Sequence, residues 1–107
     1  MVCIYEVNVF VKEGDKNKDE FLAFLKPHAD EMLTFDGFLS YEILLPEASE
    51  EEKNGNIAPI CAVYRVESRS LLEKYFNTEA SRMRADTMSK FEGRISATRR
   101  ILESYQN

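Results

Sequence analysis

Polar side chains at alternating positions of four apolar segments are the residues of this chain best suited to holding a small molecule. They are Glu6 and Asn8, Ser40 and Glu42, Arg65, and Ser96, Thr98 and Arg100. Carboxylates and guanidinium groups bind each other, and bind charged ligands, through paired hydrogen bonds. We therefore predict a ligand-binding set for a small organic molecule, in which Arg65 or Arg100 holds a carboxylate: Glu6, Asn8, Glu42, Arg65 and Arg100. The alternative is that the two acids and two arginines neutralise each other across a sheet or a dimer.

General acid–base chemistry near neutral pH has one candidate, His28, the sole histidine. Helical spacing places it near Leu25 and Met32, so the alternative is a partly buried imidazole bonded to a backbone carbonyl, Asp30 or Glu31. The sequence assigns no catalytic residue. If the chain is an enzyme, the least improbable participants are Asn8, His28 and Tyr41.

Other reactive groups indicate little chemistry. His28, Asp30 and Glu31 lack the spacing of a ligand set, so we predict no metal, and we expect no cofactor. Cys3 and Cys61 lie apart in apolar segments and are predicted to be buried free thiols.

Two further groups of residues have alternative interpretations. Aromatic residues and a methionine either fill the core or line an apolar pocket: Phe38, Tyr41, Tyr64 and Met83. Five arginines are typical of solvated positions, with anion binding as the alternative: Arg82, Arg84, Arg94, Arg99 and Arg100.

The composition of the chain limits the classes of partner that it could bind. Fourteen basic against nineteen acidic residues give a net charge of -5, which argues against nucleic acid as a partner. No apolar run approaches the roughly 20 residues of a membrane span, and the N-terminus lacks the pattern of a signal peptide. We therefore expect a cytoplasmic protein with no membrane partner, folded as one domain over residues 1–107.

Periodicity indicates the elements that must position these residues. Alternating apolar positions predict strands at 2–12, 38–46, 59–66 and 95–105, with an acidic hairpin loop at 47–58. Helical spacing predicts a helix at about 15–35, kinked or restarted near Pro27, and a second from Ser68 or Ser70 to Gly93, with a break at Asn77–Thr78. This βαββαβ order predicts an α+β, ferredoxin-like sandwich: a four-stranded antiparallel sheet with two helices on one face.

Such a sheet leaves its other face uncovered. The predicted helix-facing residues are Tyr5, Val7, Val9, Leu39, Tyr41, Ile43, Ile60, Ala62, Tyr64, Ile95, Ala97 and Ile101. The predicted opposite face contains Ile4, Phe10, Phe38, Leu44, Cys61, Val63 and Leu102. This opposite set is too apolar for a solvated surface, so we predict a homodimer that packs sheet against sheet.

Four segments carry a family resemblance: YEVNVFV, LKPHADEML, FDGFLSYEIL and YFNTEASRMRADTMSKFEGRISATRRIL. With them the chain resembles the dimeric α+β-barrel superfamily, which contains antibiotic-biosynthesis-monooxygenase-like domains. Within it, the KPH-x-x-EML helix followed by a G-F strand is similar to a small bacterial family of unknown function. The resemblance implies that Asn8 orients substrate or oxygen, and the alternative is that Asn8 is a structural hydrogen-bonding residue. Haem-degrading relatives add a tryptophan and often a histidine in the second helical segment, whereas this chain has no tryptophan and carries its histidine in the first, so we do not expect haem degradation.

Three functions remain open from the sequence. The first is a small homodimeric barrel protein of uncharacterised role that binds a small molecule. The second is a cofactor-free monooxygenase or isomerase acting on a small aromatic or carbonyl compound. The third is a structural assembly module. An enclosed cavity of roughly a few hundred Å³ that converges on Asn8 or Arg65 would favour the first two. A filled interior in which Glu6, Glu42, Arg65 and Arg100 pair with one another would exclude both.

Overall fold

The computed structural model describes residues 2–13, 16–47, 52–53, 56–57 and 59–103. Its elements, in chain order, are β1 (Cys3–Val11), α1 (Asn17–Met32), β2 (Phe38–Leu44), β3 (Glu52–Lys53), β4 (Asn56–Ile57), β5 (Ile60–Val66), α2 (Arg69–Thr78), α3 (Ala80–Phe91) and β6 (Ile95–Glu103). Strands β3 and β4 pair as a short hairpin within the predicted acidic loop. Glu50 and Glu51 of that loop lie outside the described residues.

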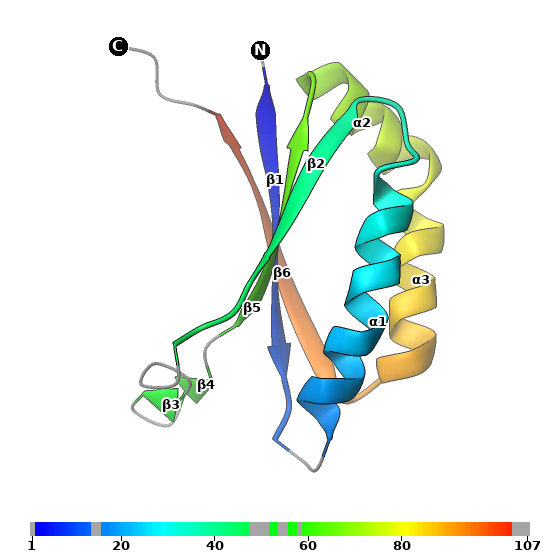
Figure 1. Ribbon diagram of the computed structural model, residues 1–107. Coiled ribbons are helices and arrows are strands. Elements are labelled where there is room, and N and C mark those ends of the chain that lie inside the picture. The colour runs from blue at the N-terminus through cyan, green and yellow to red at the C-terminus, as the bar shows by residue number, and fades with distance from the viewer. Residues whose placement is uncertain (1, 14–15, 48–51, 54–55, 58, 104–107) are drawn as a thin grey trace.

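Four strands form one antiparallel sheet in the order β2-β5-β1-β6. Figure 1 shows the helices together on one side of this sheet, and no described element covers the other side. We call that other side the open face. The arrangement confirms the predicted ferredoxin-like βαββαβ fold.

The core lies between the helices and the sheet because the side chains of a strand alternate between its two faces. In β1 and β5 the helix-facing positions Tyr5, Val9, Ala62 and Tyr64 are each no more than 5% exposed. Their neighbours on the open face are partly buried, except Arg65, which is exposed. Full burial of each large apolar side chain stabilises the fold by about 1.5–3 kcal/mol.

The predicted break in the second helix is confirmed, and the helices differ from the prediction in two other respects. The second predicted helix is two helices, α2 and α3, which adjoin at Thr78 and Glu79 close to the predicted break. The cap of α2 is Ser68, whose hydroxyl accepts a hydrogen bond from the Leu71 backbone N–H at 3.2 Å, so the alternative start at Ser70 is wrong. Helix α1 is assigned without interruption through Pro27, so the predicted restart is also wrong.

The predicted faces of β2 are wrong at its first two residues. Phe38 is 6% exposed and packs in the core, whereas Leu39 is 53% exposed. The pairing of β2 with β5 shifts between Phe38 and Ser40, and such a bulge adds one residue that breaks the alternation. After the bulge, Tyr41 and Ile43 pack against the core as predicted.

No described helix combines the length and the apolar character needed to cross a membrane.

Candidate functional site

A cavity of about 80 Å³ lies between the helices and the sheet, on the side where β1 and β6 form the floor. Its lining residues are Tyr5, Val7, Val9, Phe21, Phe24, Leu25, His28, Met32, Ala62, Tyr64, Tyr75, Met83, Arg84, Thr87, Met88, Ile95, Ser96, Ala97 and Arg99. Arg84, Met88 and Arg99 are exposed as well, so the cavity opens to solvent beside them. We call this opening the mouth.

The helical residues that line the cavity lie on one face of each helix. Phe21, Leu25, His28 and Met32 follow one another at intervals of four, three and four residues, which places them on one face of α1. Residues 83, 84, 87 and 88 likewise share one face of α3. The floor is hollow in part because Ala62 and Ala97 carry only a methyl group.

Three tyrosines from three elements line this largely apolar space. Tyr5 of β1 lies between Tyr64 of β5 and Tyr75 of α2, at ring-centroid distances of 6.0 and 6.1 Å. Burial raises the pKa of both Tyr64 and Tyr75, so these phenols stay protonated at neutral pH. They can therefore donate hydrogen bonds to a ligand.

His28 is half-buried at the cavity, and its ring lies 5.2 Å from the Phe24 ring. Burial lowers its pKa, helped by the positive charges of Arg82 and Lys90, while Glu31 and Asp86 oppose the shift. The imidazole is therefore neutral at pH 7 and has one nitrogen able to accept a proton. No described residue forms a hydrogen bond with it, so the predicted alternative of a bonded structural histidine is not seen among the described residues.

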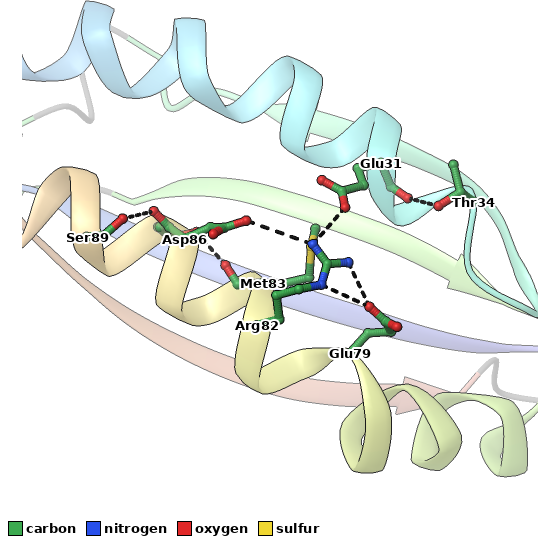
Figure 2. Close-up of polar contacts among 8 residues, drawn as sticks. Glu31, Thr34, Glu79, Arg82, Met83, Asp86 and Ser89 are labelled. Atoms are coloured by element: carbon green, nitrogen blue, oxygen red, sulfur yellow. Dashed lines mark hydrogen bonds and ion pairs between the residues drawn. The ribbon is translucent and has the colours of Figure 1, made fainter.

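Arginine side chains near the cavity fall into two kinds. Arg82 joins α3 to α1, because its guanidinium group lies 3.0 Å from a carboxylate oxygen of Glu31 and 2.7 Å from one of Glu79 (Figure 2). Asp86 adds a third carboxylate at 3.9 Å. Arg84 and Arg99 at the mouth form no ion pair with any described residue.

Most of the predicted ligand-binding set lies on the open face, away from the cavity. Cys61 Sγ donates to Asn8 Oδ1 at 2.8 Å, and Asn8 Nδ2 donates to Glu6 Oε1 at 3.0 Å. Arg100 Nε donates to the same Glu6 oxygen at 2.7 Å. Arg100 and Asn8 hold the pKa of Glu6 below its usual range. These residues form one chain of hydrogen bonds across three strands, in which one acid and one arginine of the mutual-neutralisation alternative pair with each other.

The other two members of that set are not part of this chain of hydrogen bonds. Glu42 on β2 and Arg65 on β5 are exposed, and neither forms an ion pair with a described residue. The predicted ligand-binding set therefore remains a prediction for the open face.

The three least improbable catalytic residues are not brought together. Tyr41 lies beside α1, where its hydroxyl donates to Asp30 Oδ1 at 2.6 Å and accepts from Lys26 Nζ at 2.8 Å. Neither Tyr41 nor Asn8 lines the cavity, whereas His28 does.

Sequence reasoning missed most of the polar lining. Tyr5 was predicted only as core, and Tyr75 only as part of a helix. Of the four residues predicted as alternative pocket lining, Tyr64 and Met83 line the cavity and Phe38 and Tyr41 do not. Arg84 and Arg99 were candidates for anion binding, and one further signal was available, because Arg99 occupies a helix-facing position of a strand.

Among the described residues, no group of three or more His, Cys, Asp or Glu side chains is arranged to hold a metal ion. Cys3 and Cys61 are free thiols, and burial raises the pKa of each.

Comparison with known proteins identifies a family and a fold. The family described as a domain of unknown function (DUF4286) matches residues 2–105. No curated protein matches the chain.

Solved structures match over nearly the whole chain. SnoaB, a cofactor-independent oxygenase from Streptomyces nogalater, superposes with a TM-score of 0.69 at 11% identity, covering 100% of this chain and 97% of that one. A putative antibiotic biosynthesis monooxygenase from Nitrosomonas europaea gives 0.64 at 14% identity, covering 96% and 89%. An ethyl tert-butyl ether D family protein from Bacillus halodurans gives 0.68 at 11% identity, covering 98% and 100%. At these identities the likeness concerns the fold alone.

Proposed function

This chain belongs to the DUF4286 family, and we propose that it binds a small, largely apolar organic molecule in the cavity between its helices and its sheet. The observation that carries the proposal is the lining, in which apolar and aromatic walls are interrupted by a few convergent polar groups. That composition is usual for small-molecule sites. The phenols of Tyr64 and Tyr75 form no hydrogen bond with a described side chain, so both can serve a ligand.

The size of the cavity sets the size of the ligand. An engineered apolar cavity of about 150 Å³ holds benzene. A cavity of about 80 Å³ has roughly half that volume, so it admits only part of a single ring, while the rest of the ligand projects through the mouth toward solvent.

Methionine methyl groups offer a direct test. Met32, Met83 and Met88 all line the cavity, so [¹³C-methyl]methionine labelling places three reporters around it. We expect p-cresol to shift these resonances in a saturable titration. An absence of saturable shifts would contradict the proposal.

A matched pair of variants locates the binding. Ala97→Leu adds three carbon atoms at the cavity floor and is expected to abolish the p-cresol shifts. Ala23→Leu makes the same change at an exposed position of α1 and should leave them unchanged. Equal loss in both variants, or in neither, would show that p-cresol binds elsewhere.

A second candidate function is proton transfer at a carbon atom, as in a cofactor-free isomerase or in the first step of a cofactor-free oxygenase. The observation that favours it is a neutral imidazole, that of His28, at a cavity lined by phenol donors. His28 would remove a proton from the carbon next to a carbonyl, and a phenol would donate a hydrogen bond to the enolate oxygen. Returning the proton to a different atom would complete an isomerisation.

Deuterium exchange tests this activity without an identified substrate. With phenylpyruvate in D₂O as the probe, the protein should accelerate exchange of the benzylic hydrogens, followed by NMR. We expect His28→Gln to abolish the acceleration, while the α1 surface variant Ala23→Leu retains it. Exchange that is the same with and without protein would argue against the second function.

We also propose that the protein forms a homodimer through the open face. Partly buried apolar residues occur there on three strands, including Ile4, Phe10, Val63 and Leu102. Two nine-residue strands at the centre and edge make the face roughly 30 Å by 19 Å. That extent is comparable with one side of a standard interface, about 800 Å². In such a dimer the predicted ligand-binding set would lie inside the barrel.

A further inference from the structure

We infer that the ligand of the cavity carries a carboxylate, which Arg84 and Arg99 hold at the mouth. The inference rests on the proposed function and adds the chemical class of the ligand. Two unpaired guanidinium groups beside an apolar cavity carry it.

Ion pairing sets these two arginines apart. The chain has more acids than bases, and four of its arginines contact a carboxylate: Arg69, Arg82, Arg94 and Arg100. Arg65, Arg84 and Arg99 contact none among the described residues, and of these three only Arg84 and Arg99 line the cavity. Arg84 Nη2 donates a hydrogen bond to a neutral group, the hydroxyl of Tyr5, at 3.4 Å. Both side chains are therefore free to bind an anion.

The contrast between Arg82 and Arg84 shows how local this difference is. The two residues lie two positions apart on α3, and Figure 2 shows Arg82 pointing toward Glu31 of α1. Arg84 instead reaches the tyrosines over the sheet, where it contacts Tyr5 and lies 5.9 Å from the Phe76 ring. Helix α3 therefore carries an arginine that pairs with carboxylates, Arg82, and two positions later an arginine without an ion pair among the described residues, Arg84.

Arg84 and Arg99 reach the same end of the cavity from opposite sides. Arg84 comes from α3, and Arg99 comes from the edge strand β6, where it pairs in register with the cavity residue Val7. Both residues line the cavity and both are exposed to solvent, so both border its mouth. A charged group that projects from the cavity would therefore meet these two side chains.

The lining also lacks negative charge. None of the described residues around the cavity is an aspartate or a glutamate, while its polar groups include three phenols and two guanidinium groups, which are donors. An anionic ligand group would therefore meet donors and no carboxylate in the lining. A carboxylate matches the planar fork of arginine through two parallel hydrogen bonds, whereas a ligand ammonium group would face two like charges.

Benzoate and benzamide test the inference, because they have nearly the same shape and differ in charge. Each is titrated into protein labelled at the methionine methyl groups. We expect benzoate to bind roughly tenfold more tightly, the factor typical of a hydrogen bond to a charged group. Both compounds should shift the resonances of Met83 and Met88, which line the cavity beside the mouth.

Arginine variants assign the effect to residues. Arg84→Gln and Arg99→Gln should each weaken benzoate binding by roughly five- to tenfold and leave benzamide binding unchanged. Arg69→Gln makes the same change of charge on α2, away from the cavity lining, and should leave both affinities unchanged. Arg84→Lys should restore part of the benzoate affinity, since lysine keeps the charge without the fork.

The outcomes separate the two proposals. If benzamide and p-cresol bind at the cavity and benzoate binds no more tightly, the carboxylate inference is overturned while the cavity remains a binding site. If benzoate affinity falls equally in all three glutamine variants, including Arg69→Gln, the effect is one of net charge and the inference is overturned. If none of the three probes binds, the proposed function itself fails. Retained backbone amide spectra in each variant show that the fold is intact.

Discussion

The two faces of the central sheet use polar residues in opposite ways. On the open face, Glu6, Asn8, Cys61 and Arg100 bond to one another in a continuous chain. On the helix face, the phenols, His28 and the mouth arginines surround a cavity with few bonds among themselves. Both faces belong to the same strands, and β1 contributes Glu6 to one and Tyr5 to the other.

The difference indicates which face of the sheet can give a ligand more binding energy. A polar group that is already satisfied gains little from a ligand, because the ligand only replaces an existing bond. A donor without a partner at a partly dry cavity gains a full interaction. The open face is therefore better suited to packing against another surface, and the helix face to binding a molecule. Four experiments test this division.

The largest effect is expected at the centre of the open face. Val63 pairs in register with Glu6 on one side and Glu42 on the other. Val63→Lys places a cation between two acids, which a monomer can accommodate, but it buries a charge in a sheet-to-sheet dimer. We expect loss of the dimer, at a cost of about 3–5 kcal/mol, measured by analytical ultracentrifugation.

The control for this experiment is Ser81→Lys, which makes a comparable change of charge on the exposed side of α3. It should leave the dimer unchanged. A wild-type protein that sediments as a monomer at micromolar concentration would remove the proposal of a sheet-to-sheet dimer.

A smaller effect is expected from the Glu6–Arg100 pair. Arg100→Gln should lower Tm at pH 7 by about 2–4 °C in the monomer, where the arginine is largely exposed and solvent screens the pair. Because the pKa of folded Glu6 is lowered, its stabilising contribution is present above the ordinary glutamate pKa of about 4.3 and is lost as the pH falls through the folded value. The Tm difference between the two proteins should therefore shrink on acidification below about pH 4.3.

Binding at the cavity should be unaffected by this variant. Unchanged p-cresol shifts in Arg100→Gln would support a structural role for the open-face chain of hydrogen bonds. A large loss of binding would show that the two faces are coupled, against the division drawn above.

A still smaller change in stability is expected from Tyr64→Phe. The lost hydroxyl has no described hydrogen-bond partner, so we expect the free energy of unfolding to change by less than about 0.5 kcal/mol. Affinity for ligands that accept hydrogen bonds should nevertheless fall, as titration with benzamide would measure. A strong destabilisation in urea unfolding would assign the hydroxyl to the structure instead.

The smallest effect concerns the charge of His28. As the sole histidine, it gives one imidazole signal in tag-free protein, and NMR titration should place its pKa below the ordinary value of about 6.5. The corresponding stability is complete above that value and declines as the pH falls through the folded pKa. Saturation with benzoate should raise the pKa of His28, because it adds a negative charge nearby. A pKa at or above the ordinary value would contradict the burial of the ring.

Strand alternation explains how much of the two faces could be predicted. It placed Glu6, Asn8 and Arg100 on one face and Tyr5, Ala62 and Tyr64 on the other, because a regular strand permits no other arrangement. The same rule failed at Phe38 and Leu39, where a bulge inserts a residue with no local sequence mark. Helical spacing placed His28 at the border of α1, but not over a cavity.

The sequence by itself determined the order of elements, the sheet and the polar line on the open face, since these follow from periods of two and 3.6 residues along the chain. Only the tertiary structure decided the cavity and its mouth. Four elements contribute Tyr5, Tyr75, Arg84 and Arg99. Whether these residues line one cavity depends on the packing distance of α2 and α3 from β6. The distance between packed elements is a property of the folded chain, and so is the choice of which arginines pair with a carboxylate. Local sequence patterns encode neither.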